Sequence, residues 1–447
     1  MTAIKQIFKS KSFSSLLGNG MGAVLGLLTF SLLARFLDKP AFGAWLVFLT
    51  IYGIFDTLRI GMVLNALVKN LAQAKTEEEA GRVIGSSLFI SLVITLIYVL
   101  LNGIGFLICY SLDWIPDYQS FFKWFILIAI FSLPHNFASW ILNARLEIIN
   151  MSVLRILSQL VFIAYIFLVI RLDATVEQTF LGYTLAQILP SLYALYKSWA
   201  GFHHLKAYTR DMLSQIFHFG KYSMGTLIGS NLLRSSDTFI ITSTLGSGAV
   251  ATYNVPLRMI EIIEMPLRSF TVTALPGYAK LVADGKFEEL REVYERRTGL
   301  IFYLLLPVSF LSFLLADWVV LLLGGSSYQD AGILLRLFAS YMAILPLDKF
   351  SGVLLDTINK PNLNFYKVMI MLAVNVAGDY LGILLFGNLH SVAVASTLTF
   401  IAGMLFGYYQ LKKYTGIRFP YVLSQGWVEF IFWIKKIVKR HGSQTAQ

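Results

Sequence analysis

Four charged side chains recur within the otherwise apolar stretch PLRMIEIIEMPLRSF, residues 256–270. On a helix that advances by about 100° per residue, they share a sector of about 120°: Arg258, Glu261, Glu264 and Arg268. Spacings of three and four residues allow neighbours on this stripe to form ion pairs. A charge at the centre of a bilayer costs about 2.5–3.5 kcal/mol. The stripe therefore indicates either structural ion pairs or a water-filled cavity in which arginines face an anion.

Two other apolar segments carry polar residues of the same kinds. Asp56 and Arg59 lie in one, and Asn231, Arg234 and Asp237 lie in the other. The planar guanidinium group suits bidentate binding of phosphate. We therefore predict a substrate site that binds an anion, with these residues as its ligands: Arg59, Asn231, Arg234, Arg258 and Arg268.

Carboxylates in the apolar segments are candidates for ion coupling or gating, with Na⁺ or H⁺ as the coupling ion. The candidates are Asp56, Asp237, Glu261, Glu264, Asp348 and Asp379. Asp348 precedes Lys349, which predicts a local ion pair. Asp379 follows Asn375 by one helical turn, so the two could bind a cation together or pair with other helices.

Several kinds of catalytic site are absent from the sequence. It contains neither a GxxxxGK[ST] loop nor an HExxH motif. Its single cysteine, Cys109, excludes an internal disulfide and a cysteine-based metal site. We therefore expect no cofactor, no metal site and no enzymatic activity. Energy for transport would come from an ion gradient, the membrane potential or consumption of the product.

The composition is that of an integral membrane protein. Hydrophobic residues make up 57% of the 447 residues and charged residues only 14%, against roughly 25% charged residues in soluble domains. We predict an all-α protein, because lipid leaves an open strand without hydrogen-bond partners. Twelve transmembrane helices are expected near 14–37, 42–67, 83–110, 120–144, 151–171, 177–200, 218–245, 249–276, 298–323, 331–357, 362–386 and 391–411.

The basic residues are concentrated in alternate connections and near both ends of the chain. Connections such as 246–249 and 387–391 are short and carry no Lys or Arg. The positive-inside rule then places both termini in the cytoplasm, which explains the net charge of +11 without nucleic acid. A thirteenth crossing would break this alternation, so residues 416–447 are predicted to be an interfacial, basic amphipathic tail.

The chain also contains an internal repeat. Residues 35–73 align with residues 243–281 at a shift of 208 residues, which places Asp56 over Glu264. An even number of spans in each half makes the repeat parallel. The predicted organisation is an N-terminal six-helix lobe (1–205), a cytoplasmic linker (206–217), a C-terminal six-helix lobe (218–415) and the tail. The polar spans are expected to meet around a cavity between the lobes.

Short motifs give the sequence a resemblance to a known family. These are Leu33-Ala34-Arg35, Phe42-Gly43, the Asn359-Lys360-Pro361 turn and Asn375. Together with segments 32–69 and 358–398, they resemble the Wzx-type polysaccharide flippases of the multidrug/oligosaccharidyl-lipid/polysaccharide (MOP) exporter superfamily. That superfamily also contains lipid II flippases and drug exporters of the MATE type. The resemblance covers roughly residues 12–415.

The resemblance implies a transporter that turns an undecaprenyl-pyrophosphate-linked oligosaccharide from the cytoplasmic to the periplasmic leaflet by alternating access. It implies a bacterial inner-membrane location and cavity arginines that hold the pyrophosphate or acidic sugars, here Arg59 and Arg258 or Arg268. The neighbouring acids argue against a highly anionic glycan unless some become protonated. We expect a monomer that contacts membrane lipids, with polysaccharide polymerase machinery as a candidate partner and no nucleic acid. The alternatives are a MATE-like exporter of small cationic compounds and a non-transporting scaffold of a polysaccharide assembly complex.

Overall fold

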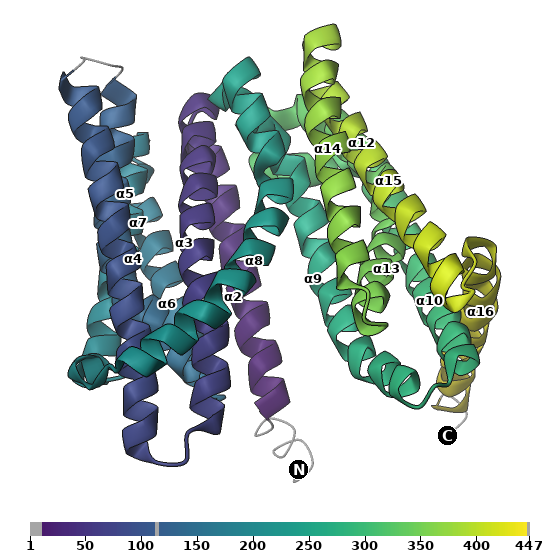
Figure 1. Ribbon diagram of the computed structural model, residues 1–447. Coiled ribbons are helices and arrows are strands. Elements are labelled where there is room, and N and C mark those ends of the chain that lie inside the picture. Colours follow the sequence, from purple (N-terminus) through teal and green to yellow (C-terminus); the bar gives the residue numbers. More distant parts are fainter. Residues whose placement is uncertain (1–10, 112–115, 445–447) are drawn as a thin grey trace. The chain divides into compact units, whose positions relative to one another are not determined.

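The protein is helical throughout the described part of the chain, residues 11–111 and 116–444 of a computed structural model (Figure 1). The ends of the predicted first lobe and of the tail, residues 1–10 and 445–447, lie outside it. No strand occurs in the described ranges. The prediction of an all-α fold is confirmed.

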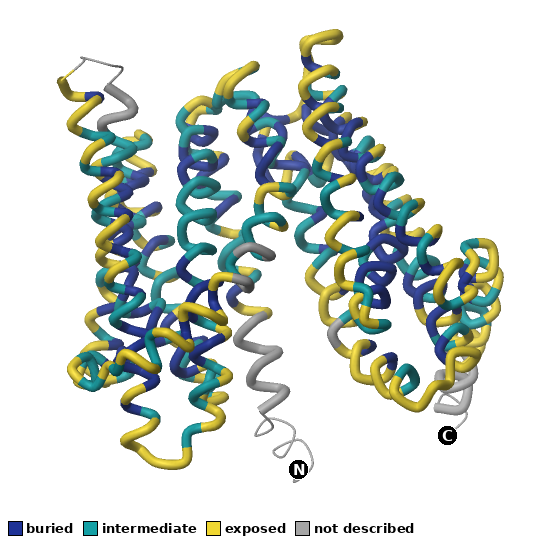
Figure 2. Tube along the Cα trace, in the orientation of Figure 1, coloured by how far each residue is buried: buried dark blue, intermediate teal, exposed yellow. Residues whose placement is uncertain are grey.

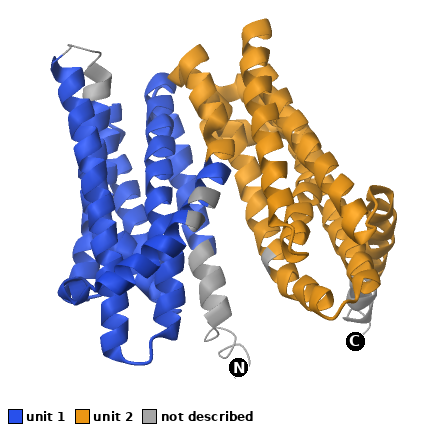
Figure 3. Ribbon diagram, viewed as in Figure 1, with its two compact units in different colours: residues 1–231 blue, residues 232–447 orange. Residues whose placement is uncertain are grey.

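The chain forms two compact units, residues 1–231 and 232–447, shown in different colours in Figure 3. The division falls within one helix, α8. Residues 210–217 of the predicted linker already belong to that helix. The lobe and linker boundaries given by the sequence remain a prediction.

Unit 1 contains helices that correspond to the first six predicted spans and the first part of α8. Their bounds are α2 (Lys11–Phe36), α3 (Lys39–Gln73), α4 (Glu77–Ser111), α5 (Pro116–Ala144), α6 (Ile148–Tyr165), η1 (Ile166–Ile170), α7 (Val176–Tyr196), η2 (Phe202–Ala207) and α8 (Arg210–Leu245).

Unit 2 contains the remainder of α8 and all later helices. Their bounds are α9 (Ser247–Ala283), α10 (Phe287–Leu314), α11 (Ala316–Gly324), η3 (Ser326–Ala331), α12 (Gly332–Met342), α13 (Leu345–Thr357), α14 (Pro361–Phe386), α15 (Leu389–Thr415) and α16 (Phe419–Gln444).

Many of these helices suit a bilayer. Seven helices of the described residues are long and apolar enough to cross a membrane, or eight if the bent pair around residues 343–344 is one span. Neither α8 nor α9 is among the seven, and these two helices carry most of the predicted polar site. The chain is therefore a multi-pass membrane protein whose polar residues are concentrated in particular helices.

The helix boundaries reproduce the internal repeat. A shift of 208 residues carries Lys39, the first residue of α3, to Ser247, the first residue of α9. The two-residue slip expected after this segment carries Glu77, where α4 begins, to Phe287, where α10 begins. The parallel repeat predicted from weak sequence similarity thus has a structural counterpart in the start of each helix.

Two predicted spans are interrupted. The span expected at 298–323 ends as α10 at Leu314 and resumes as α11 at Ala316. The span expected at 331–357 consists of α12 and α13, which are bent by 45° relative to each other. Pro346 occupies the first turn of α13, where a missing backbone N–H is tolerated. Both interruptions lie within continuous apolar sequence, so the hydropathy pattern did not predict them.

Each unit has its own packed interior, visible as the dark blue segments of Figure 2. In unit 1, Trp45 and Phe48 of α3 pack against Phe180 of α7, with ring centroids 5.8 and 4.6 Å away respectively. In unit 2, the buried rings of Tyr294 and Tyr408 join α10 to α15. Aromatic contacts thus join neighbouring helices within each unit.

The C-terminal helix α16 packs along α10 (Figure 1). A Cβ atom added at Gly299 of α10 would lie 2.5 Å from the Cα atom of Gly426 in α16, so only glycine allows this backbone approach. Tyr303 stacks on Phe430 at 5.9 Å beside this crossing. The tail is therefore a docked helix, and its interfacial location remains a prediction.

Candidate functional site

In unit 1, Arg59 of α3 is a buried cation with several partners. Its side chain is 2% exposed, and its Nη2 atom lies 2.5 Å from Oδ1 of Asp56. Its Nη1 atom donates to Thr95 Oγ1 of α4 at 3.3 Å. The guanidinium carbon lies 5.7 Å from the ring centroid of Trp140 in α5. Arg59 therefore joins three helices of unit 1, and its predicted role as a substrate ligand would require these contacts to rearrange.

Hydroxyl groups extend this polar interior. Tyr52 and Ser132 share a hydrogen bond of 2.7 Å between α3 and α5. Tyr98 of α4 donates to the carbonyl oxygen of Phe55 at 2.5 Å. Ser191 of α7 donates to the carbonyl oxygen of Phe131 at 2.6 Å. Such groups can move a proton or accommodate a changed arginine position without leaving a buried polar group unsatisfied.

In unit 2, the charged stripe of α9 forms the ion pairs that its spacing predicts. Arg258 pairs with Glu261. Arg268 Nη2 lies 3.1 Å from Glu264 Oε2. Arg234 of α8 reaches the same two acids, with its Nη2 atom 3.6 Å from Glu261 Oε1 and 4.0 Å from Glu264 Oε2. The structure thus brings four predicted site residues together with a fifth from the neighbouring helix.

Lys349 also belongs to this group, although the sequence predicted that it pairs with Asp348. Lys349 Nζ of α13 lies 3.6 Å from Glu264 Oε1. The local Asp348–Lys349 ion pair is therefore wrong, because adjacent residues on a helix point about 100° apart. Asp348 instead faces α14, where Lys367 Nζ donates to its Oδ1 atom at 2.8 Å.

We call the resulting group the α9 cluster: Arg234, Arg258, Glu261, Glu264, Arg268 and Lys349. Its four cations and two carboxylates leave a net charge of +2. Glu264 is the least exposed side chain of its ion pairs, at 12%, whereas its three cationic partners are 40–57% exposed. The cluster therefore presents guanidinium and ammonium groups outward from a partly buried carboxylate.

A second feature of unit 2 is a pair of carboxylates between α8 and α14. Asp379 is 0% exposed, and neither of its carboxylate oxygens receives a hydrogen bond from the described residues. The Asp237 carboxylate lies next to it and accepts a 2.5 Å hydrogen bond from Tyr253 of α9. Ionised carboxylates have no proton to donate and repel each other, so a proton or a cation bound between these two would stabilise the pair.

Asn375 is close to this carboxylate pair but already has a partner. Its Oδ1 atom accepts a 2.5 Å hydrogen bond from Ser236 of α8, and its side chain is buried. Asn375 and Asp379 lie one turn apart on α14 and both face α8, as their spacing suggested. Among the described residues, no group of three or more His, Cys, Asp or Glu side chains could hold a metal ion.

Asp348 and Asn231 have local or structural partners. The Asp348–Lys367 pair is almost completely buried, with both side chains 4% exposed, and Lys367 Nζ also donates to the backbone oxygen of Asp348 at 2.8 Å. Asn231 donates to the carbonyl oxygen of Leu227 at 3.0 Å, one turn earlier on α8. Their predicted roles in coupling and substrate binding remain predictions.

Two contributors to these sites, Lys367 and Tyr253, were absent from the predicted site residues, and a third, Lys349, was predicted with the wrong partner. Lys367 and Tyr253 lie in apolar runs, and Tyr253 aligns with Trp45 in the repeat. The sequence contains one signal for Lys367: it lies inside the span predicted at 362–386, and a charge within a membrane span needs a partner. That signal identifies Lys367 as paired but does not identify its partner.

Comparison with known proteins places the chain in context. The model of the family described as "Polysaccharide biosynthesis protein" matches residues 8–282, and the MatE model matches residues 223–385. A curated relative is the probable low-salt glycan biosynthesis flippase Agl15 of Haloferax volcanii. It is 24% identical over 213 residues, which are 47% of this chain and 44% of the relative. The match thus spans less than half of that protein's length.

Solved structures share the fold. An inward-facing MATE family multidrug resistance transporter of the MOP superfamily has a TM-score of 0.72 at 16% identity, covering 90% of this chain and 99% of its own. The lipid II flippase MurJ in an inward closed conformation has a TM-score of 0.65 at 14% identity, covering 95% of this chain and 92% of its own. At these identities the similarity establishes the fold.

Proposed function

Since the chain belongs to the polysaccharide biosynthesis protein family, we propose that it flips an undecaprenyl-pyrophosphate-linked oligosaccharide across a membrane by alternating access. The direction is from the cytoplasmic to the periplasmic leaflet of a bacterial inner membrane, with both termini in the cytoplasm. The protein works as a monomer, and polysaccharide polymerase machinery is a candidate partner. The curated relative with a flippase description supports the substrate class.

The observation that carries this proposal is the net positive charge of the α9 cluster, which side chains of α8, α9 and α13 form together. A diphosphate diester bears one negative charge on each phosphorus, which complements the net charge of +2. Each arginine has five N–H donors in a planar fork, which suits it to contact a phosphate as well as a carboxylate. Arg234, Arg258 and Arg268 can therefore bind phosphate oxygens while Glu261 and Glu264 keep them oriented.

The glutamates also explain how the substrate could be released. Phosphate and carboxylate compete for the same guanidinium donors, so the bound diphosphate gains less than it would from unpaired arginines. A transporter needs such intermediate affinity, because a substrate that binds too tightly in one leaflet is not delivered to the other. Lys349 adds a charge from α13, so rearrangement of the bent α12–α13 pair would change the cluster.

We assign the coupling role to the Asp237–Asp379 pair. Two neighbouring carboxylates repel each other when both are ionised, and a bound H⁺ or Na⁺ removes that repulsion. Tyr253 of α9 holds Asp237, and α9 also carries the α9 cluster. Occupancy of the carboxylate pair can thus affect substrate binding through one helix. In unit 1, substrate binding by Arg59 and Asn231 and a coupling or gating role for Asp56 remain proposals from the sequence.

The test is flipping of a short undecaprenyl-pyrophosphate glycan by purified protein in proteoliposomes. Arg258→Ala/Arg268→Ala removes two charge-assisted contacts worth about 1.5–3 kcal/mol each, so flipping should fall at least tenfold. Arg296→Ala is the matched control, because Arg296 forms an exposed pair with Glu292 on α10. Equal flipping by both variants, with normal folding, would reduce the α9 cluster to structural ion pairs.

A MATE-like exporter of small cationic compounds is the second candidate function. The MatE model matches residues 223–385, which contain the carboxylate pair. An organic cation could occupy the position that we assign to H⁺ or Na⁺. Efflux of a cationic dye that Asp379→Asn abolishes, without any glycan flipping, would favour this function. Absence of both activities in well-folded protein would favour a non-transporting scaffold.

A further inference from the structure

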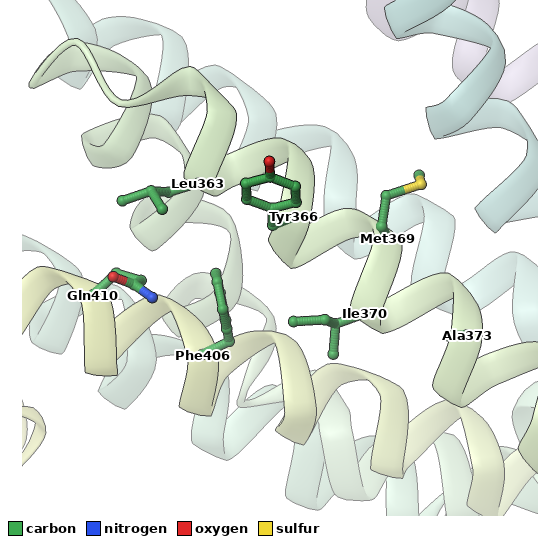
Figure 4. Close-up of a pocket in the computed structure, with 7 residues that line it drawn as sticks. All are labelled: Leu363, Tyr366, Met369, Ile370, Ala373, Phe406 and Gln410. Carbon is green, nitrogen blue, oxygen red and sulfur yellow. The ribbon is translucent and has the colours of Figure 1, made fainter.

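Unit 2 has a groove on its surface that the proposed transport site does not use. The groove runs between α14 and α15 and has a volume of about 510 Å³. Figure 4 shows the residues of both helices that line it. Its walls are mainly apolar and comprise Leu363, Tyr366, Met369, Ile370, Phe406 and Gln410, with Ala373 farther along α14.

The surroundings of the groove are those of a lipid-facing surface. Both α14 and α15 are long and apolar enough to cross a membrane. Exposed apolar side chains flank the groove, including Phe365 on α14 and Leu405 and Tyr409 on α15. The hydrocarbon of a membrane lipid is therefore the chemistry available to fill it.

One end of the groove is positively charged. Lys360 is the N-cap residue of α14, three positions before Leu363, and Lys413 lies in the last turn of α15. Both ammonium groups lie over the ring of Tyr414, at 5.0 and 5.6 Å from its centroid. Tyr414 is one turn beyond Gln410, so the two cations stand beside the groove's end. An elongated apolar channel with cations at one end is complementary to a lipid that carries a phosphate.

The lining favours one branched, unsaturated chain over a pair of acyl chains. A single channel between two helices accepts one chain, whereas a phospholipid has two. Met369, Tyr366 and Phe406 offer soft sulfur and aromatic surfaces, and methionine adapts to irregular apolar shapes. Gln410 adds an amide donor near the charged end.

We propose that this groove binds the polyprenyl chain of a polyprenyl phosphate lipid, with Lys360 and Lys413 contacting its phosphate. The inference rests on the proposed function for the identity of the lipid. It adds a holding site on unit 2 that is separate from the α9 cluster. There the chain and the phosphate of the lipid are bound together, at a stage before or after the α9 cluster binds the phosphates.

The experiment measures binding of undecaprenyl phosphate, without a glycan, to the full chain by native mass spectrometry. Ala373→Trp fills the groove and should weaken binding at least tenfold. Leu385→Trp is the matched control, because Leu385 lies at the other end of α14 and is 73% exposed; it should change binding less than twofold. Ile370→Gln makes the lining polar and tests the same point if Ala373→Trp does not fold.

Two further probes identify the recognised chemistry. Lys360→Gln/Lys413→Gln should weaken undecaprenyl phosphate binding and leave undecaprenol, which lacks the phosphate, unchanged. Equal binding of undecaprenyl phosphate by the filled and control variants would overturn the proposal. A second result would also overturn it: phosphatidylglycerol binds the wild-type protein as tightly as undecaprenyl phosphate does, and Ala373→Trp weakens the binding of both lipids equally. The groove would then hold membrane lipids in general.

The outcome is separable from that of the proposed function. Wild-type protein that flips the glycan lipid but binds undecaprenyl phosphate independently of Ala373→Trp refutes the groove alone. Wild-type protein that binds the polyprenyl lipid in the groove but flips no glycan refutes the transport proposal alone.

Discussion

Replacing Lys367 with methionine leaves the Asp348 carboxylate buried without its counter-ion. Both side chains are only 4% exposed, and Lys367 Nζ is 2.8 Å from Asp348 Oδ1. It also donates to the Asp348 backbone oxygen, at 2.8 Å, and to Ser351 Oγ, at 3.4 Å. Water cannot readily replace these contacts at such burial. Removing one partner of a buried pair typically costs about 3–5 kcal/mol.

The effect should be visible in thermal unfolding of detergent-purified protein followed by tryptophan fluorescence. A unit of this size shifts its midpoint by about 2–4 °C per kcal/mol, so Lys367→Met should lower it by on the order of 10 °C. Lys286→Met is the matched control, because Lys286 pairs with Glu289 on an exposed surface, 3.7 Å apart. Such surface pairs contribute about 0–1 kcal/mol, and the control should shift the midpoint by a few degrees at most.

The double variant Asp348→Leu/Lys367→Met completes the argument. Replacing a whole buried ion pair by apolar residues is often neutral or stabilising, so most of the lost stability should return. Gradient-driven transport should return with it, because we assign coupling to Asp237 and Asp379. A Lys367→Met midpoint like that of wild type would refute the energetic reasoning. A stable double variant that has lost coupling would restore Asp348 as a coupling residue.

Two other substitutions test separate features of unit 2. Asp379→Asn removes one of two facing carboxylates; it should raise the unfolding midpoint and abolish the dependence of transport on a Na⁺ or H⁺ gradient. A lower midpoint, or unchanged gradient dependence, would contradict the carboxylate-pair assignment. Gly299→Ala inserts a methyl group at the α10–α16 crossing and should destabilise by about 1–3 kcal/mol through overpacking. Gly103→Ala, with no neighbour within 4 Å of the added Cβ atom, should be neutral or slightly stabilising. Similar midpoints for the two alanine variants would show that α16 is loosely docked.

Features that depend on short spacing were predictable from the sequence. The pairs Arg258–Glu261 and Glu264–Arg268 follow from residues three and four apart on one helix face. The repeat follows from a constant shift, which reappears in the starts of α3 and α9. Neither conclusion requires knowledge of how helices pack.

Features that depend on contacts between helices were not predictable in this way. Lys349 reaches Glu264 across 85 positions of the chain, while its sequence neighbour Asp348 turns to Lys367. The sequence prediction paired Asp348 with Lys349 because they are adjacent in the chain, but adjacent side chains on a helix point about 100° apart. The burial of Arg59 is a similar case, since it depends on Thr95 and Trp140 from two other helices. Partners of buried charges must be found in the fold.

Cargo identity is the central claim, and one assay with wild-type protein tests it most directly. Proteoliposomes would contain a fluorescent undecaprenyl-pyrophosphate glycan, and a cationic dye would be enclosed in a parallel preparation. Our account predicts gradient-stimulated transfer of the glycan lipid between leaflets and no protein-dependent dye transport. Dye transport without transfer of the glycan lipid would contradict it and identify the chain as an exporter of cations.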